Sequence, residues 1–236
     1  MSPISPATST ASPLGQARSS TQRRGILFII SAPSGTGKTT LCKQLTASVP
    51  DLWHSISYTT RQPRPGEEHG REYFFIDETK FQEMIDRHEF VEWARVYGHL
   101  YGTPRKMLAD RIDQGIDVLL EIDVQGAIQV KKKFEDAVSV FILPPSMNTL
   151  RARLQSRASD SAEEIQRRLQ KVKEEVWSYR EYAYIVRNDD LARSLRDLEN
   201  IFLAERLKTR RMDIAWIENN FLTSDDSKPG DRKDLP

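Results

Sequence analysis

The stretch SAPSGTGKTT, residues 31 to 40, follows the apolar run ILFII and restricts the folds open to this chain. A strand, a turn of the form G-x-x-x-x-G-K-[ST] and a helix make a loop whose N–H groups and helix N-terminus hold phosphate oxygens. Gly35 and Gly37 let the backbone approach the phosphates, Lys38 can reach the β and γ phosphates, and the Thr39 hydroxyl can ligate Mg²⁺. Ala32 replaces the first glycine, a small change if that position needs no positive φ. The alternative to a phosphate-binding loop is a glycine-rich turn that only caps a helix, but such a turn needs no Lys-Thr pair at this spacing.

Composition limits the function classes. The chain has 236 residues, 38% of them hydrophobic, so it can bury a sizeable core. Its net charge is +1, with 35 basic and 34 acidic residues, and gives no reason to expect a nucleic-acid or membrane partner. The single cysteine, Cys42, excludes an internal disulfide and suits a reducing compartment. No apolar run approaches the roughly 18 residues of a membrane helix. We expect a cytoplasmic protein, with a homo-oligomer left open.

The two ends differ in composition from the rest. Residues 1–24 are rich in Ser, Thr, Pro and Ala, contain no acid and have no apolar core of a signal peptide. We predict a disordered tail there, with an organelle transit peptide as the alternative. Residues 223–236 are also predicted to be disordered, which leaves a working protein of about residues 25–222.

Short apolar runs alternate with helical patterns along most of that span. Near-continuous apolar segments at 26–30, 117–124, 138–143 and 182–186 are typical of strands buried on both faces of a parallel sheet. A period of 3.6 predicts helices over 39–47, 125–134, 147–156, 161–180 and 191–209, with a capping box of Ser161 and Glu164. The alternation indicates a βαβ architecture.

Residues 53–106 break this alternation. They read as SISYTTRQPRPGEEHGREYFF, a helical FQEMIDRHEFVEWA, and VYGHLYGTP, which predicts a small mixed insertion with antiparallel strands around the turn RPGEEHG. A kinase needs an acceptor pocket beside its phosphate loop, and this insertion could supply one. Arg61 and Arg64 suit a second phosphate, and Tyr73 and Tyr101 could add phenolic donors. Taken singly, each could equally be aromatic core or a solvated arginine.

Seven stretches resemble guanylate kinase in order, over nearly all of residues 25–210: SAPSGTGKTT, SYTTRQPRPGE, REYFF, EFVEWA, YGTP, EIDVQG and NDDL. The resemblance implies an α/β fold, a three-layer α/β/α P-loop NTPase core with a mostly parallel sheet, a small mixed α+β GMP-binding insertion and a helical lid. The core would comprise 25–56 and 107–222, with the lid at about 153–168, and the insertion 57–106.

The resemblance also implies the site. ATP would be held by Ala32, Pro33, Ser34, Gly35, Thr36, Gly37, Lys38 and Thr39, with Asn188 near the adenine. GMP would be held by Ser57, Arg61, Arg64, Tyr73, Glu92, Tyr101, Thr103 and Asp123. Catalysis would use Lys38, Arg61 and the lid residues Arg157 and Arg168, with Arg153 a weaker candidate. This sequence departs from the family in Ala32, in Glu121, where many members carry Asp, and in RAS at 157–159, where Arg-Gly is common.

The chemistry of guanine points to the same residues independently. Guanine offers N1–H and N2–H donors and an O6 acceptor, so its pocket needs carboxylates and hydroxyls. Glu92 and Asp123 can supply the first, and Ser57 and Thr103 the second; adenine would leave the carboxylates unpaired. Asp123 can alternatively cap the helix expected near Gln125, alone or together with a ligand role.

The acceptor oxygen of GMP is already ionised near neutral pH, so the mechanism needs no general base. Alignment and charge neutralisation by Lys38, Mg²⁺ bound through Thr39, and the lid arginines should suffice. Three alternatives stay open: a non-catalytic interaction module of this fold, another nucleoside monophosphate kinase, and a P-loop ATPase. The intact Gly37-Lys38-Thr39 disfavours the first, and the paired acids with SYTTRQPR disfavour the other two.

Overall fold

The computed structural model describes residues 23–155 and 162–222. They fall into two units, a larger one over residues 23–212 and the described part of a smaller one, residues 213–222. The smaller unit consists of α8 (Ile214–Phe221), whose N-cap Asp213 accepts a hydrogen bond from the Trp216 N–H. Within the described ranges, no helix has the length and apolar character needed to cross a membrane.

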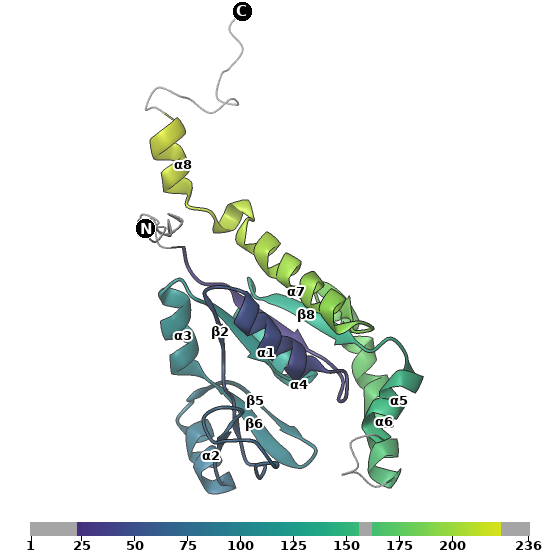
Figure 1. The fold of residues 1–236 in the computed structure, drawn as a ribbon. Coiled ribbons are helices and arrows are strands. Elements are labelled where there is room, and N and C mark those ends of the chain that lie inside the picture. The colour runs from purple at the N-terminus through teal and green to yellow at the C-terminus, as the bar shows by residue number, and fades with distance from the viewer. Residues whose placement is uncertain (1–22, 156–161, 223–236) are drawn as a thin grey trace, which may run out of the picture. The chain divides into compact units, whose positions relative to one another are not determined.

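The larger unit alternates strands and helices (Figure 1). In chain order its elements are β1 (Leu27–Ser31), α1 (Lys38–Ser48), β2 (Leu52–His54), β3 (Tyr58–Thr59), β4 (Phe74–Phe75), α2 (Glu78–Asp86), β5 (Phe90–Val96), β6 (His99–Pro104), α3 (Arg105–Asp113), β7 (Asp117–Glu121), α4 (Val124–Lys133), β8 (Val138–Leu143), α5 (Met147–Gln155), α6 (Ala162–Val176), the 3₁₀ turn η1 (Trp177–Glu181), β9 (Tyr184–Arg187), α7 (Leu191–Arg206) and the 3₁₀ turn η2 (Thr209–Arg211).

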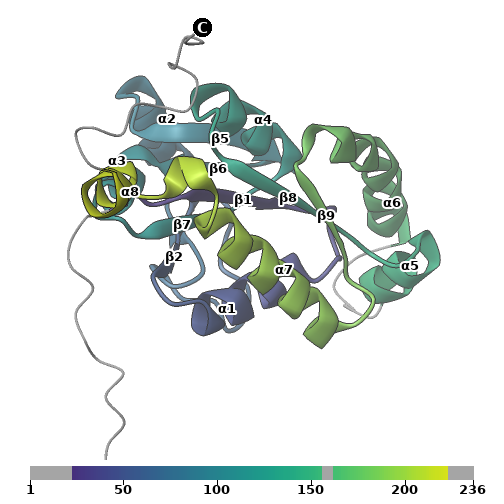
Figure 2. The ribbon, with the colours of Figure 1, turned by 90° about the horizontal axis from the view of Figure 1, so that it is seen from above.

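The main sheet has five parallel strands in the order β2-β7-β1-β8-β9. Every residue of β1 is buried because helices cover both faces. Phe28 and Ile30 pack with α1 and α7 on one face, whereas Leu27 and Ile29 pack with α3 and α4 on the other. Side chains alternate along a strand, so this single apolar run serves both cores. Figure 2 shows the resulting three layers, which confirm the predicted fold class.

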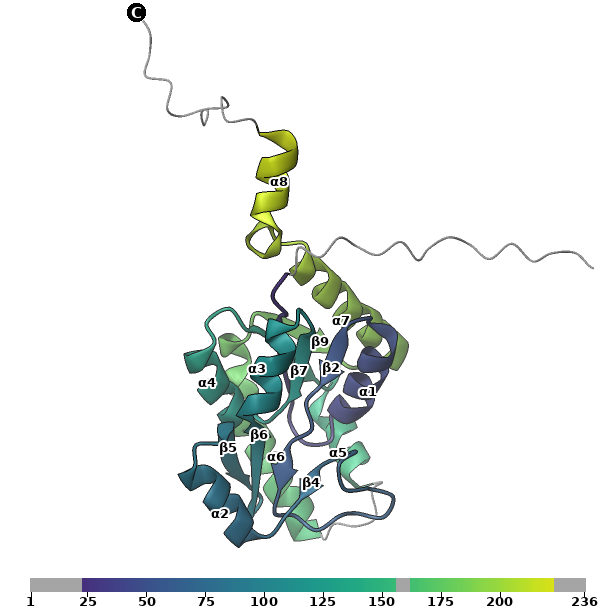
Figure 3. The same cartoon turned by 90° about the vertical axis from the view of Figure 1, so that its left-hand side faces the viewer.

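The second sheet, called the acceptor sheet below, has the order β4-β3-β6-β5 and packs against α2 (Figure 3). Phe81 and Met84 of α2 join Phe90 and Leu100 of the sheet in a separate small core. The predicted antiparallel pairing around RPGEEHG is wrong, because β3 and β4, which flank that turn, pair in parallel. Residues 60–73 are long enough to carry the chain back to the same end of the sheet, and the antiparallel partner of β3 is β6.

Three further expectations need correction. The predicted helix FQEMIDRHEFVEWA ends at Asp86, and Phe90–Val96 is strand β5. The chain turns at His88, whose φ is 53°, and a helix cannot continue through that conformation. Trp53 and His54, which the break in alternation placed with the insertion and the family resemblance placed in the core, belong to β2 of the main sheet. The helix expected over 161–180 becomes a 3₁₀ turn after Val176, and α3 was not predicted.

The expected lid is described only in part. Helices α5 and α6 pack against each other through Leu150, Leu154, Leu169 and Val172. The capping box proposed for Ser161 and Glu164, and the loop arginine Arg157, lie outside what the structure describes.

Candidate active site

The phosphate loop, residues 32–39, lies between β1 and α1, at the carboxyl end of the central strand. In open α/β sheets this edge is where ligands bind. Gly35 and Gly37 have φ of 88° and 90°, which residues with a Cβ rarely adopt. A Cβ on Gly37 would also lie 2.8 Å from the amide nitrogen of Asn188. Ala32 is not among the described residues with positive φ, so its methyl group is compatible with the loop.

Two residues named in the sequence analysis, Asn188 and Arg153, hold the backbone of this loop by hydrogen bonds. The Asn188 side chain donates to the Thr36 carbonyl at 2.6 Å, and Arg153 donates to the same carbonyl at 3.2 Å. Arg153 also donates to the Asn188 carbonyl at 3.3 Å. Asn188 is buried and does not line the cavity in front of the loop. In this structure its amide therefore fixes the loop backbone.

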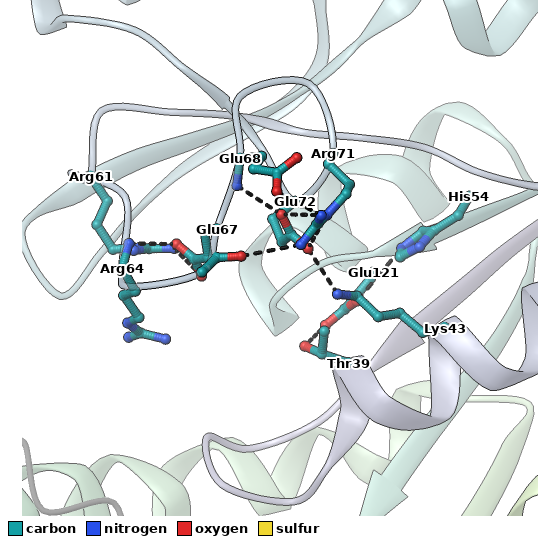
Figure 4. A network of polar contacts seen from close by, with 11 residues as sticks. Thr39, Lys43, His54, Arg61, Arg64, Glu67, Glu68, Arg71, Glu72 and Glu121 are labelled. Atoms are coloured by element: carbon teal, nitrogen blue, oxygen red, sulfur yellow. Dashed lines mark hydrogen bonds and ion pairs between the residues drawn. The ribbon is translucent and has the colours of Figure 1, made fainter.

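Lys38 and Thr39 face the end of β7. Lys38 Nζ donates to the Ile122 carbonyl at 3.0 Å and lies 4.0 Å from Glu121 Oε1. The Thr39 hydroxyl donates to Glu121 at 2.5 Å, and His54 lies 3.5 Å from the other oxygen of that carboxylate (Figure 4). Burial lowers the pKa of His54, although Glu121 opposes the shift. A hydroxyl and a carboxylate side by side are the hard oxygen donors that Mg²⁺ accepts.

One cavity, of about 270 Å³, joins the phosphate loop to the acceptor sheet. The structure brings most of the predicted site residues together around it. Besides residues 32–39, the predicted residues lining it are Ser57, Arg64, Tyr73, Glu92, Tyr101, Asp123 and Arg168. The residues predicted for the acceptor side and for the donor side come from segments far apart in the sequence, and they line the same cavity.

Glu92 is the buried acid of this cavity. Its side chain accepts a hydrogen bond from the Thr103 hydroxyl at 2.5 Å, and Thr103 is itself fully buried. Burial raises the pKa of Glu92 to about 7, with Asp123 adding to the rise and the Thr103 hydrogen bond opposing it. Its Oε2 lies so close to Gly126 that a Cβ there would be only 2.5 Å away. The first turn of α4 therefore makes room for this carboxylate.

Asp123 caps the helix that follows it, as its position in the sequence suggested. It is the N-cap of α4, and its Oδ1 accepts a hydrogen bond from the Gly126 N–H at 2.8 Å. It also lines the cavity beside Glu92. The capping prediction is confirmed, and the second carboxylate oxygen has no part in that cap.

Arg61 and Arg64 lie in the loop between β3 and β4. Glu67 accepts two hydrogen bonds from Arg61 Nη2, at 3.0 and 2.8 Å, and one from the Arg64 N–H at 2.9 Å. The Arg61 guanidinium lies 5.4 Å from the Tyr73 ring centroid. Arg64 lines the cavity, whereas Arg61 and Thr103 do not. Sequence reasoning missed Glu67, although its spacing from both arginines in RQPRPGE was a usable signal.

Sequence reasoning also missed an aromatic residue and an acid that line the cavity. Tyr97 from the β5–β6 turn and Glu175 from α6 line the cavity together with Arg168. The guanidinium of Arg168 lies 5.3 Å from the Tyr97 ring centroid. No single motif contains both Tyr97 and Arg168, so only the tertiary arrangement could reveal their contact.

Comparisons with known proteins identify the family of the chain. The guanylate kinase family matches residues 24–205. The guanylate kinase of Geobacter metallireducens is 49% identical over 191 residues, which cover 81% of this chain and 94% of that protein. That of Geobacter sulfurreducens is 48% identical over 197 residues, 84% of this chain and 97% of that protein. A crystal structure of guanylate kinase from Anaplasma phagocytophilum superposes with a TM-score of 0.74 at 33% identity, covering 86% of this chain and 99% of that one. The chain belongs to the guanylate kinase family.

Proposed function

We propose that this chain is an enzyme of purine nucleotide metabolism that transfers the γ-phosphoryl group of ATP to GMP, giving ADP and GDP. The observation that carries the proposal is a cavity lined both by the phosphate loop and by Glu92, Tyr73 and Arg64 of the acceptor side. A donor triphosphate on the loop and an acceptor monophosphate against the sheet would meet inside it. Phosphoryl transfer needs this alignment more than it needs covalent chemistry.

The base of the acceptor would be read by Glu92 and Asp123. The ionised Glu92 carboxylate accepts N1–H and N2–H of guanine, while Ser57 faces O6. Thr103 orients the Glu92 side chain, because its hydroxyl donates a hydrogen bond to that carboxylate. Adenine lacks the N2 amine and would leave a buried carboxylate unpaired, which hydrogen-bonding sites reject by about 10⁴ to 10⁵.

The acceptor phosphate would be held by Arg64, Tyr73 and Tyr101. Burial raises the pKa of Tyr73, so its phenol remains a hydrogen-bond donor at neutral pH. Arg61 is the fourth phosphate ligand in this proposal. Its guanidinium donates to Glu67 and does not line the cavity, so binding of a phosphate there requires a change of side-chain position.

The donor side would use the phosphate loop, Lys38 and the α6 arginine Arg168. Thr39 and Glu121 are oxygen donors suited to Mg²⁺, Glu121 through water, and Mg²⁺ when bound would neutralise charge on the donor phosphates. Lys38 would then hold the β and γ oxygens, and Arg168 and Arg157 would offset charge on the transferring group. Asn188 would contribute to the ATP site by holding the Thr36 carbonyl.

A cytoplasmic location belongs to the same proposal, with ATP and GMP as partners and a homo-oligomer left open. The single cysteine, Cys42, is buried and suits a reducing compartment.

The test is nucleoside diphosphate formation by the purified chain with ATP and Mg²⁺, offering GMP, AMP, CMP and UMP separately and with no acceptor. GDP from GMP alone is the expected result, and Lys38→Met should abolish it with the fold intact. Phosphate release without an acceptor would indicate an ATPase, and another diphosphate would overturn the guanine pocket. No turnover by the native chain would revive the interaction module. Omission of Mg²⁺ tests the metal requirement.

A further inference from the structure

The hairpin that joins β5 to β6 turns at Tyr97 and Gly98. Both have positive φ, 48° and 85°, and Val96 pairs with His99 across the turn. Two central residues in the left-handed region make the tight hairpin turn whose twist matches its strands. Asn, Asp or Gly usually occupy such positions, and a tyrosine there is disfavoured. Turn preference alone does not account for Tyr97.

The Tyr97 ring faces a row of cations on α6. Lys171 Nζ lies 4.4 Å from the ring centroid, and the guanidinium carbons of Arg168 and Arg167 lie at 5.3 and 5.5 Å. These distances are within the range in which the negative face of an aromatic ring attracts a cation. Lys171 is also paired with Glu175 at 3.6 Å, one turn further along α6.

The other side of α6 is fixed independently. Leu169 and Val172 pack with Leu150 and Leu154 of α5, so the apolar stripe of α6 faces α5. Tyr97 and Arg168 both line the cavity that contains the phosphate loop. The ring thus joins the acceptor sheet to the helix that presents Arg168 at the reaction site.

We propose that Tyr97 is a positioning residue for phosphoryl transfer, whose ring holds α6 so that Arg168 faces the donor phosphates when the acceptor sheet is in place. This inference rests on the proposed function. It assigns Tyr97 no contact with substrate: it acts through the cations of α6. A ring on a rigid two-residue turn can do this because its position follows the strands of the acceptor sheet.

The expected effect is on the transfer step and not on acceptor binding. Cation–π attraction at partly buried sites corresponds to about a 5- to 30-fold change in an equilibrium constant. Loss of the ring should therefore lower the single-turnover rate of GDP formation by about that factor. GMP affinity should change little, because the guanine and phosphate ligands lie on other residues.

The experiment compares three full-length variants with the native chain: Tyr97→Leu, Tyr97→Phe and Trp177→Leu. Rapid-quench single turnovers at saturating ATP and excess enzyme report transfer, and equilibrium titration with GMP reports binding. Tyr97→Phe keeps the ring face and should retain the native rate. Trp177→Leu is the matched control, since Trp177 has Arg180 at 4.7 Å from its ring but does not line the cavity.

A slow transfer step in Tyr97→Leu, with rescue in Tyr97→Phe and a native rate in Trp177→Leu, supports the inference. Native rates in Tyr97→Leu, or equal losses in Tyr97→Phe, would overturn it. If Tyr97→Leu does not fold, a double-mutant comparison with Arg168→Met replaces it. Tyr97→Phe and Tyr97→His must then have different transfer rates in the chain that keeps Arg168. The two transfer rates must be equal in the chain that carries Arg168→Met. Failure of the proposed function looks different, because the native chain itself would make no GDP.

Discussion

Gly126→Ala separates the stability of the fold from the geometry of the acceptor pocket. Gly126 lies in the first turn of α4, where alanine is favoured over glycine by about 1 kcal/mol. The added Cβ would lie 2.5 Å from Glu92 Oε2 and 3.0 Å from Glu92 Cδ, whereas ordinary contacts begin near 3.4 Å. The carboxylate would have to move by about 0.9 Å, the difference between these two distances, while the Thr103 hydroxyl holds its other oxygen.

A displacement of about 1 Å at a positioned group can reduce a rate by about 10²-fold. We therefore expect kcat/KM for GMP to fall by about 10² in Gly126→Ala, while the melting temperature stays level or rises slightly, because the helix gain offsets the local crowding. Steady-state assays with GMP varied at saturating ATP measure the first quantity, and thermal unfolding measures the second. Gln125→Ala is the matched control, because Gln125 is an exposed neighbour in the same turn. A native kcat/KM in Gly126→Ala would refute the argument that Glu92 depends on the space left by this glycine.

Four further outcomes are expected. The KM for GMP should rise as pH falls from 8 to 6, because the pKa of Glu92 is raised to about 7 and only its ionised form accepts the guanine donors; Thr103→Val should move this transition to higher pH, because the Thr103 hydrogen bond lowers that pKa. Arg61→Ala should raise the KM for GMP and leave the KM for ATP near native, as steady-state assays with each substrate varied would show. Gly37→Ala should abolish turnover, since the residue has φ of 90° and an added Cβ would lie 2.8 Å from a buried amide; unfolding curves would show whether the chain still folds. Asp117→Ala should reduce the free energy of unfolding, measured by denaturant titration, by about 3 kcal/mol or more. Asp117 is fully buried and forms ion pairs with two arginines, and the change leaves both arginines without this partner. An unchanged denaturation midpoint would count against that reasoning.

The main sheet could be predicted from sequence because its strands carry their own signal. A run such as ILFII has no polar face, so it must be covered on both sides, and its alternating residues do pack into two cores. The acceptor sheet lacked such a signal. EFVEWA was expected to extend a helix, and only the left-handed backbone at His88, which no pattern revealed, starts a strand there. The pairing of β3 with β4 depends on how residues 60–73 return, which is a tertiary matter.

The candidate site also has residues that the sequence predicts and contacts that it does not. Residues within contiguous motifs, such as Lys38, Glu92 and Arg64, were predicted, and they line one cavity. The supporting contacts were missed because their partners come from distant segments: Tyr97 meets α6, and Gly126 meets β5. A sequence pattern reports residue type and spacing along the chain, and neither quantity says which glycine faces which carboxylate.

The loop of residues 60–73 shows how such contacts relate the two halves of the site (Figure 4). Glu72 accepts hydrogen bonds from the Glu68 N–H, from Lys43 of α1 and from Arg71, and these lower its pKa to about 2. Glu72 is therefore ionised at any pH at which the protein would work.

Lys43 lies on α1, the helix that also carries Lys38, so its ion pair with Glu72 connects the loop of residues 60–73 to the donor side. Within that loop, Glu67 orients Arg61 and the backbone of Arg64. The arginines proposed to hold the acceptor phosphate are thus positioned by acids, and not by the phosphate alone. The same loop contacts α1, the helix that follows the phosphate loop, through Glu72 and orients Arg61 through Glu67, so it connects the donor side of the site with the acceptor side.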